Sequence, residues 1–312
     1  MGYTREDFSV LKHLKCSRNG GMNDGICLVR NRRRDIICIE KRISKAFIRD
    51  YDQPGREVRG LASCQHSHIV KYLHHDFDYH RLGYGSIFMQ YCELGSIDDM
   101  IAKYGHHPGR YVPEGFLWKI LWDISLALCY LRLGTDAAKA AQHGKCLSER
   151  NKKKGWKVIV HRDIKPANVF LTWSNAATRY PVVVLGDFGC CITQSQMRDN
   201  VLSVFTAEFT PPEAPYFSSS SDIYSLALTV HCAALGRQTP YHRKDLLEQL
   251  PLGRDAGYSK ELQNVLRRCL SIDPVNRPDA MYLPYLVWRE MSKAKEARHG
   301  VPHKSLPSWA LR

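Results

Sequence analysis

Two short motifs near the middle of this chain hold the residue types that phosphoryl transfer requires. His161–Asn168 reads HRDIKPAN, and the sequence GDFG, which contains Asp187, begins eighteen residues after this motif ends. Phosphoryl transfer needs little covalent chemistry, so catalysis depends on holding metal ions, phosphates and the attacking hydroxyl in line. We expect Asp163 to accept the proton of that hydroxyl and Lys165 to reach the transferred phosphate. Asn168 and Asp187 are the expected ligands of Mg²⁺, with Mn²⁺ as an alternative ion.

Each of these residues alone could be an ordinary surface or turn residue, but the ordered set argues against that interpretation. Further motifs extend the pattern, and over about residues 8–290 the chain resembles a protein kinase. The β-branched run at 36–43 predicts a strand, and its Lys41 matches the lysine that binds the α- and β-phosphates of ATP. Glu57, in a predicted helix near residues 55–64, matches the ion-pair partner of that lysine. The alternative is that both are solvated surface charges.

The resemblance also implies an adenine pocket at a hinge between two lobes. Residues 86–96 indicate a strand that runs into a linker with a glycine. Met89 would be the gatekeeper while also packing in the core, and the backbone of Gln90 and Cys92 would bond to the adenine edge. The residues expected to contact ATP are Gly20, Gly25, Cys27, Ile39, Lys41, Met89, Gln90, Cys92, Phe170 and Asp187.

The loop that would cover the phosphates departs from the pattern G-x-G-x-x-G-x-V. Gly20 and Gly25 fit the first and third glycines, Met22 stands at the second, and Cys27 replaces the valine that would pack on adenine. We expect weaker ATP binding rather than inactivity, because such a loop acts largely through its backbone N–H groups. The irregular loop, together with departures from the family pattern at Tyr224 and Ala227 near the central helix, leaves one alternative function, a nucleotide-binding pseudokinase that serves as a scaffold.

Three further residues match structural positions of the family. Glu213 closes the predicted activation segment, and its expected partner is Arg277. A buried ion pair of this kind should be costly to break, because the remaining charge would be unmatched. Asp222 matches the aspartate that begins the long central helix and supports the catalytic loop from below.

Regulation is expected in the segment between Asp187 and Glu213. Ser203 and Thr206 are candidate phosphate acceptors, and a phosphate on Ser203 could pair with Arg162 beside the base. Leu202 occupies the usual position of the primary site, so the alternative is an enzyme that needs no phosphorylation in this loop.

The catalytic motif also indicates a subfamily. Its sequence KPAN favours serine/threonine over tyrosine acceptors, and the longer run HRDIKPANVFL is most similar to the NIMA-related serine/threonine kinases. The expected partners are therefore protein substrates with Ser or Thr acceptors. Ala167 stands where arginine-directed kinases commonly have glutamate, so no strong preference for basic residues before the acceptor is expected.

The resemblance implies an α+β fold with two lobes, an antiparallel sheet with one helix followed by a larger, mainly helical lobe. The expected organisation is an N-terminal extension (1–7), a kinase domain (8–291) and a basic flexible tail (292–312). Within the domain we expect an N-lobe (8–90), a hinge (90–95), a C-lobe (96–291) and an exposed, mobile basic insertion (134–157). The preferred interpretation of this insertion is a tolerated surface loop, and the alternative is a docking element.

Composition is that of a globular protein, with 44% hydrophobic and 24% charged residues. The net charge of +14 could attract anionic partners, but a solvated basic face is the preferred interpretation, and no specific nucleic acid is predicted. The eleven cysteines show no C-x-x-C spacing and no signal peptide is evident, which favours reduced thiols in the cytoplasm or nucleus. The sequence contains no apolar run of 18 residues, so no membrane span is predicted. It also contains no sustained coiled-coil heptads that would favour self-association, so a monomer is expected.

Overall fold

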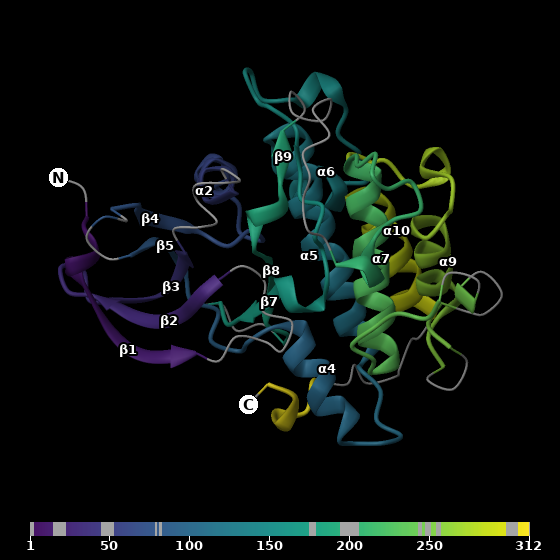
Figure 1. Cartoon of the computed structure of the whole chain (residues 1–312). Helices are drawn as coiled ribbons and strands as arrows, with labels where there is room; N and C mark the ends of the chain where they lie inside the picture. The colour runs from purple at the N-terminus through teal and green to yellow at the C-terminus, as the bar shows by residue number, and fades with distance from the viewer. Residues whose placement is uncertain are drawn as a thin grey trace.

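The computed structural model has two lobes, and the chain passes from the first to the second near residue 90 (Figure 1). It describes residues 3–14, 23–44, 53–78, 80, 83–174, 179–193, 206–242, 245–246, 251–253, 257–297 and 305–311. An antiparallel sheet with one helix forms the smaller lobe, and the larger lobe is mainly helical. The structure therefore confirms the two-lobed α+β fold predicted from the sequence.

The N-terminal lobe is a five-stranded antiparallel sheet. Its strands are β1 (Phe8–Leu14), β2 (Asn23–Asn31), β3 (Ile36–Ser44), β4 (Tyr72–Asp76) and β5 (Tyr84–Gln90), in the order β1-β2-β3-β5-β4. Side chains alternate between the two faces of a strand. One face accordingly buries a cluster of Ile43, Val70, Ile87, Met89, Cys92 and Val184, while the other buries Phe8, Cys27, Val29, Cys38 and Phe88. Helix α2 (Gln53–Ser63) links the sheet to the segment around Asp187.

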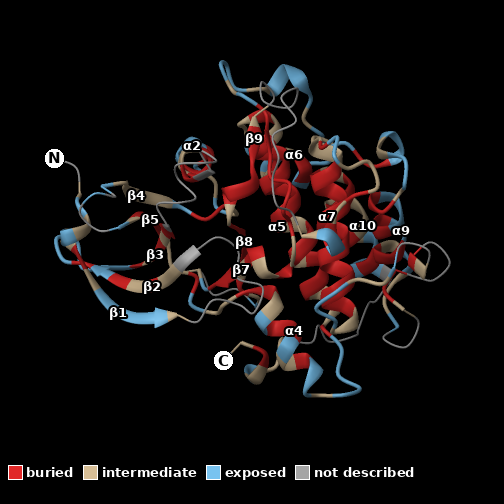
Figure 2. Ribbon diagram, viewed as in Figure 1, coloured by how far each residue is buried: buried red, intermediate tan, exposed pale blue. Residues whose placement is uncertain are grey.

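Helices α5 (Glu114–Leu133) and α7 (Ser219–Leu235) form the buried centre of the C-terminal lobe. Both are apolar around most of their circumference, as expected for core helices, and appear largely red in Figure 2. Helices α4 (Ile97–Gly105), α9 (Lys260–Cys269) and α10 (Leu283–Ala297) pack around them. In the described part of the chain, no helix combines the length and apolarity needed to cross a membrane.

Two short antiparallel ribbons hold the motifs that the sequence singled out. Strand β6 (Ile159–Val160) pairs with β9 (Ile192–Thr193), and β7 (Val169–Thr172) pairs with β8 (Val182–Leu185). The HRDIKPAN motif is the loop from β6 to β7, which ends in the 3₁₀ helix η3 (Pro166–Asn168). Asp187 lies in the loop from β8 to β9, just before the 3₁₀ helix η4 (Phe188–Cys190). The ribbons therefore bring two loops distant in sequence to the same place.

The basic insertion at 134–157 is an anchored element rather than the mobile loop that the sequence predicted. It contains helix α6 (Ala138–Gln142) and the 3₁₀ helix η2 (Glu149–Asn151). Ala137 and Ala141 are buried, and α6 packs against α10. The sequence showed the polar surface of this segment but not the small residues that attach it to the lobe.

The prediction of a flexible tail from residue 292 is wrong for two parts of that tail. Helix α10 continues to Ala297, and the 3₁₀ helix η8 (Ser308–Ala310) packs against α4. The Trp309 ring stacks on His107 with ring centroids 3.8 Å apart, and Ala310 is 1% exposed. These contacts explain why this uncharged, proline-containing end of the tail docks on the lobe.

Candidate active site

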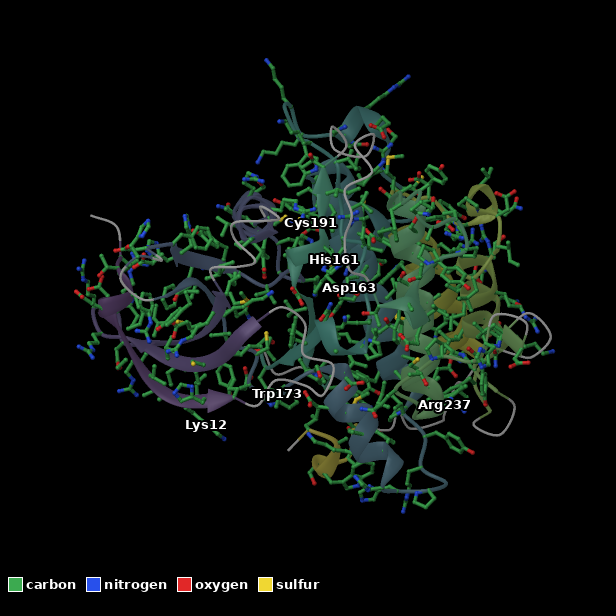
Figure 3. The ribbon with its side chains drawn as sticks, in the orientation of Figure 1. Lys12, His161, Asp163, Trp173, Cys191 and Arg237 are labelled. Atoms are coloured by element: carbon green, nitrogen blue, oxygen red, sulfur yellow. The ribbon has the colours of Figure 1, made fainter. Side chains whose placement is uncertain are left out.

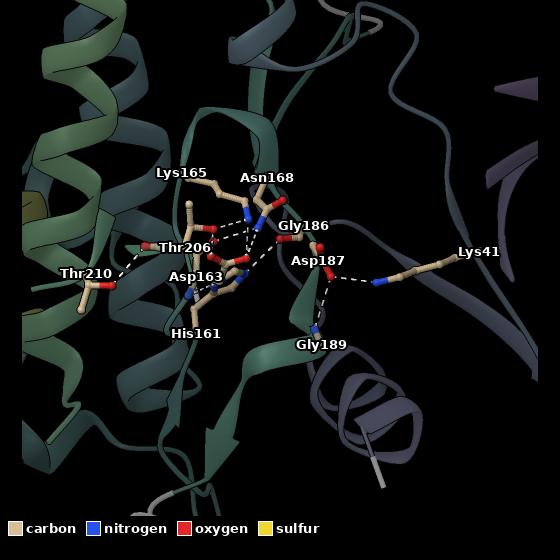
Figure 4. Close-up of polar contacts among 10 residues, drawn as sticks. All are labelled: Lys41, His161, Asp163, Lys165, Asn168, Gly186, Asp187, Gly189, Thr206 and Thr210. Carbon is tan, nitrogen blue, oxygen red and sulfur yellow. Dashed lines mark hydrogen bonds and ion pairs between the residues drawn. The ribbon is translucent and has the colours of Figure 1, made fainter. Parts of the chain in front are cut away.

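Lys41 lies between two carboxylates at the junction of the lobes. Its Nζ is 2.9 Å from both carboxylate oxygens of Glu57 and 2.8 Å from Oδ1 of Asp187 (Figure 4 shows the Asp187 contact). Burial alone would lower the pKa of Lys41, but the two carboxylates outweigh it and raise that pKa. Burial likewise opposes ionisation of Asp187, yet the Lys41 ammonium lowers the pKa of Asp187 to about 2. Lys41 and Asp187 are therefore both charged at neutral pH.

A close contact that the sequence analysis missed places helix α2 against the segment after Asp187. Gly60 faces Cys191 and Phe188, and a Cβ at Gly60 would lie 2.7 Å from Cys191 Sγ and 3.4 Å from Phe188 Cδ1. A side chain at this position would therefore require Cys191 or α2 to shift. A glycine within a predicted helix was the one available signal, because glycine there costs stability unless packing requires it.

Asp163 is the centre of a second network, drawn in Figure 4. Asn168 Nδ2 donates to the Asp163 backbone carbonyl at 2.8 Å and to its Oδ2 at 2.9 Å. Lys165 Nζ lies 2.9 Å from the same Oδ2, and Thr206 Oγ1 donates to Oδ1 at 3.0 Å. The carboxylate is thus held through both oxygens, with only 8% of the residue exposed.

Thr206 takes a position that the sequence did not predict. Besides its bond to Asp163, its hydroxyl accepts a hydrogen bond from Lys165 Nζ at 2.6 Å. The sequence placed Thr206 among the candidate phosphate acceptors, whereas the structure builds it into the network of the base. Ser203, the other candidate acceptor, lies outside the described residues, as does Gly20 of the glycine loop.

The catalytic loop is supported from below by Asp222, at the start of α7. Its carboxylate accepts the backbone N–H of His161 at 2.8 Å and that of Arg162 at 2.9 Å. Arg162 has φ of 69°, an unfavourable conformation for a side-chain-bearing residue, and these bonds help to hold it. The Arg162 Nε donates to the Cys190 carbonyl at 2.6 Å. Figure 3 shows His161, Asp163 and Cys191 near the junction of the lobes.

The two metal-ligand candidates are coupled through the backbone. The Gly186 N–H donates to the Asn168 carbonyl at 2.9 Å, and His161 Nε2 lies 2.9 Å from the Gly186 carbonyl. A carboxamide and a carboxylate offer the hard oxygen donors that Mg²⁺ prefers, and such sites are commonly completed by substrate phosphates and water. Asn168 and Asp187 therefore fit a magnesium ion bound together with a nucleotide.

Glu213 and Arg277 form a bidentate ion pair, with N–O distances of 2.7 and 2.8 Å. Arg277 is 5% exposed, and Ser221 Oγ donates to Glu213 at 2.6 Å. Burial opposes ionisation of Glu213, but the bonds from Arg277 and Ser221 lower its pKa overall. The pair ties the segment after Thr206 to the region between α9 and α10.

Several residues expected to contact adenine share the Lys41 face of the sheet. Ile39 lies opposite Met89 in the β3–β5 register, and both pack in the cluster that Phe170 flanks. The hinge differs in one detail from the expectation. The Gln90 N–H already donates to the Lys71 carbonyl at 2.9 Å. Of the backbone groups of Gln90, only the carbonyl is therefore left as a candidate hydrogen-bond partner for adenine.

The prediction that Cys27 packs on adenine is wrong, because Cys27 faces away from this pocket. It lies opposite Glu40 in the β2–β3 register and is fully buried with Phe88 on the other face of the sheet. The β2–β3 register is regular from Gly25 onward, so the error came from matching Gly25 to the third glycine of the family pattern, which placed the expected adenine contact one residue too far along β2. Ile26, opposite Lys41, and Leu28, opposite Ile39, are the β2 residues on the pocket side.

Cys190 and Cys191, which follow the GDFG motif, are buried rather than exposed thiols. Burial raises the pKa of each to about 12, so neither is a thiolate at neutral pH. Their contribution is packing, as the contact between Cys191 and Gly60 illustrates.

Comparison with known proteins agrees with this geometry. The protein kinase domain family matches residues 152–288. The G2-specific protein kinase nimA of Emericella nidulans is 28% identical over 298 residues, which cover 89% of this chain and 40% of nimA. The G2-specific protein kinase nim-1 of Neurospora crassa is 30% identical over 86% of this chain and 32% of nim-1. Human serine/threonine-protein kinase Nek2 is 28% identical over 71% of this chain and 46% of Nek2.

The chain thus spans between about a third and a half of the length of these three relatives. The matches to nimA and nim-1 are long enough to extend into both lobes, and the ordered motifs occupy the junction described above. The chain belongs to the protein kinase family, and NIMA-type serine/threonine kinases are among its relatives.

Proposed function

We propose that this chain transfers the γ-phosphoryl group of ATP to serine and threonine hydroxyls of protein substrates. The observation that carries the proposal is the Asp163 network, in which Lys165, Asn168 and Thr206 all bond to one aspartate. An ion pair of Lys41 with a helical glutamate accompanies it, and such a pair has to be in place for kinase activity. The names of the relatives support serine and threonine as acceptors.

In the proposed reaction, the acceptor hydroxyl oxygen attacks the γ-phosphorus as the bond from that phosphorus to the β–γ bridging oxygen breaks. ADP leaves, and Asp163 accepts the hydroxyl proton. Lys165, beside the base, stabilises negative charge on the transferred group, and Lys41 holds the α- and β-phosphates. The carboxylate of Asp163 is suited to this role because its neighbours fix its orientation before the substrate arrives.

Asn168 and Asp187 would hold magnesium, which when bound neutralises charge on the β- and γ-phosphates. Their shared backbone link through Gly186 fixes the spacing of the two ligand positions. The Lys41 ammonium keeps the Asp187 carboxylate ionised, which is the form a metal ligand needs.

The alternative, a pseudokinase scaffold, rested on the irregular glycine loop. That loop lies partly outside the described residues, whereas the groups for proton transfer, metal binding and phosphate binding are assembled in one place. This assembly favours an active enzyme.

The ten described cysteines are all free thiols, which supports an intracellular location.

The test is transfer of radiolabelled phosphate from magnesium ATP to generic Ser/Thr substrates, with wild type compared with Asp163→Asn. We expect the variant to lose at least about 100-fold in kcat. Asp35→Asn is the matched control, because Asp35 is exposed and its φ of 54° suits asparagine. Wild-type protein that melts cooperatively but transfers no phosphate to any of several substrates would favour the scaffold.

A further inference from the structure

The insertion at 134–157 presents a concentrated positive surface. It contains seven lysine and arginine residues against two acidic residues. Six of the seven are exposed, and Figure 2 shows the tip of this element in pale blue beyond the end of α5. These six are Lys139, Lys145, Arg150, Lys153, Lys154 and Lys157. The charge excess of the chain is therefore partly gathered at one place on its surface.

The insertion is held firmly at its base. Trp156 packs over Gly134, where a Cβ would lie 2.5 Å from the indole, and its Nε1 donates to the Leu131 carbonyl at 3.0 Å. The Lys153 N–H donates to the Leu133 carbonyl at 2.8 Å, and Thr135 Oγ1 donates to the Asn151 carbonyl at 2.7 Å. A surface loop without a role would need none of these contacts. A pre-arranged set of charges loses less entropy when it binds a partner.

Five of the exposed basic side chains are available to a partner. In the described part of the chain, Lys139 in α6 has no side-chain hydrogen bond or ion pair, and neither do Lys145, Arg150, Lys154 and Lys157. The acidic residue Glu149, in contrast, is already engaged by Arg132. The surface therefore retains unneutralised positive charge.

The composition of the insertion selects among anionic partners. Binding of single-stranded nucleic acid favours large exposed aromatic rings for stacking, but the one Phe, Tyr or Trp residue here, Trp156, is packed at the base, which leaves only the His143 ring exposed. A membrane surface would call for apolar anchors beside the charges, and the only leucine here, Leu147, packs toward the lobe. A carboxylate-rich peptide requires charge alone, at a surface dominated by lysine.

We propose that the insertion is a docking surface for an acidic segment of the protein substrate, separate from the segment that carries the acceptor. The inference rests on the proposed kinase function. Docking at a second site raises the effective concentration of the acceptor at Asp163, so its effect appears in KM rather than in kcat. Because the charges are exposed, the effect weakens as salt increases.

The test compares two peptides with the same Ser acceptor sequence, one of which continues through a Gly/Ser linker into a run of glutamates. A linker of about 20 residues spans roughly 25 Å on average, and shorter and longer versions cover other distances. With wild type at low salt we expect the acidic extension to lower KM by about tenfold, the effect of several exposed ion pairs together. The variant Lys145→Gln/Arg150→Gln/Lys154→Gln/Lys157→Gln should give both peptides the KM of the unextended one, at unchanged kcat.

A matched control removes three exposed charges elsewhere, Lys12→Gln/Arg32→Gln/Arg34→Gln, and should keep the preference for the extended peptide. Equal KM values for the two peptides with wild type, or a preference that survives in the insertion variant, would overturn the proposal. So would a single-stranded RNA that binds the insertion when the acidic peptide does not.

Binding of the acidic peptide without an acceptor, followed by fluorescence anisotropy, separates this proposal from the proposed function. If no peptide is phosphorylated but the insertion variant still loses peptide binding, the docking surface stands and the kinase activity fails. If peptides are phosphorylated but the acidic peptide does not bind, the kinase activity stands and the docking surface fails.

Discussion

Replacing Gly60 with alanine should disable the site without touching any group that reacts. The new Cβ would lie 2.7 Å from Cys191 Sγ, whereas nonbonded heavy atoms prefer about 3.5 Å or more, so roughly 0.8 Å of movement is needed, and because Cys191 is buried we expect α2 to take part of it. The same helix carries Glu57, whose contacts with Lys41 are 2.9 Å. A shift of that size would stretch them beyond the range of about 3.2 Å for a good hydrogen bond.

Displacements near 1 Å can lower catalytic rates by about 100-fold, and we expect a loss of that order in kcat/KM for Gly60→Ala, or about 2.7 kcal/mol. The assay is steady-state phosphorylation of a Ser/Thr peptide, with thermal unfolding measured in parallel. An ordinary helical glycine predicts the opposite result, because alanine would stabilise the helix by about 1 kcal/mol and leave activity unchanged.

A second substitution separates steric displacement from general damage. Cys191→Ala removes the sulfur that alanine at position 60 would meet, so the double variant Gly60→Ala/Cys191→Ala should recover at least about tenfold of the lost kcat/KM. Wild-type kcat/KM in Gly60→Ala, or a double variant no more active than Gly60→Ala itself, would refute the reasoning.

Three further predictions test other parts of the structure. Thr206→Val removes the hydroxyl that joins Asp163 to Lys165 and should lower kcat by about 10- to 100-fold in peptide kinetics, whereas Thr206→Ser keeps it. Arg277→Met leaves the Glu213 carboxylate without its partner and should cost about 3 kcal/mol in urea unfolding, more than Arg268→Met. Burial lowers the pKa of His231 to about 4, and protonation of the unfolded state should therefore reduce the free energy of unfolding by about 2 kcal/mol between pH 7 and pH 5.

The sign of the pH effect follows from the hydrogen bonds of His231. Its Nδ1 bonds to the Pro251 carbonyl, and its Nε2 accepts the Tyr241 N–H at 3.3 Å, so the folded state holds the neutral ring. The unfolded state binds a proton near its ordinary pKa of about 6.5, so stability is lost as pH falls from there toward 4. In His231→Gln this component should be absent. An unchanged pH dependence in that variant would assign the effect to other groups.

For the other two predictions the contrary results are equally plain. Full activity in Thr206→Val would mean that the hydroxyl does not help to hold the base. Arg277→Met with the stability of Arg268→Met would mean that Glu213 finds another partner or water when the arginine is lost.

The sequence by itself determined the general architecture and predicted the candidate site residues. It singled out Lys41, Asp163, Asn168 and Asp187 because each stands in a motif where spacing is fixed by one local loop or strand. The two-lobed fold followed from the order of those motifs, and the strand of Lys41 followed from its β-branched residues. Local signals of this kind survive folding because they depend on neighbours in the chain.

Only the tertiary structure decided which residues support those groups. Cys27 was assigned to the wrong face because an offset of one residue in matching the glycine pattern moves a strand residue to the opposite face, and only the pairing of β2 with β3 shows the register. The contact of Gly60 with Cys191 and the bonds of Thr206 to Asp163 join residues more than forty positions apart in the chain. The docking of Trp309 on His107 likewise joins distant segments. Such contacts depend on how separate elements pack, which residue type and spacing alone do not specify.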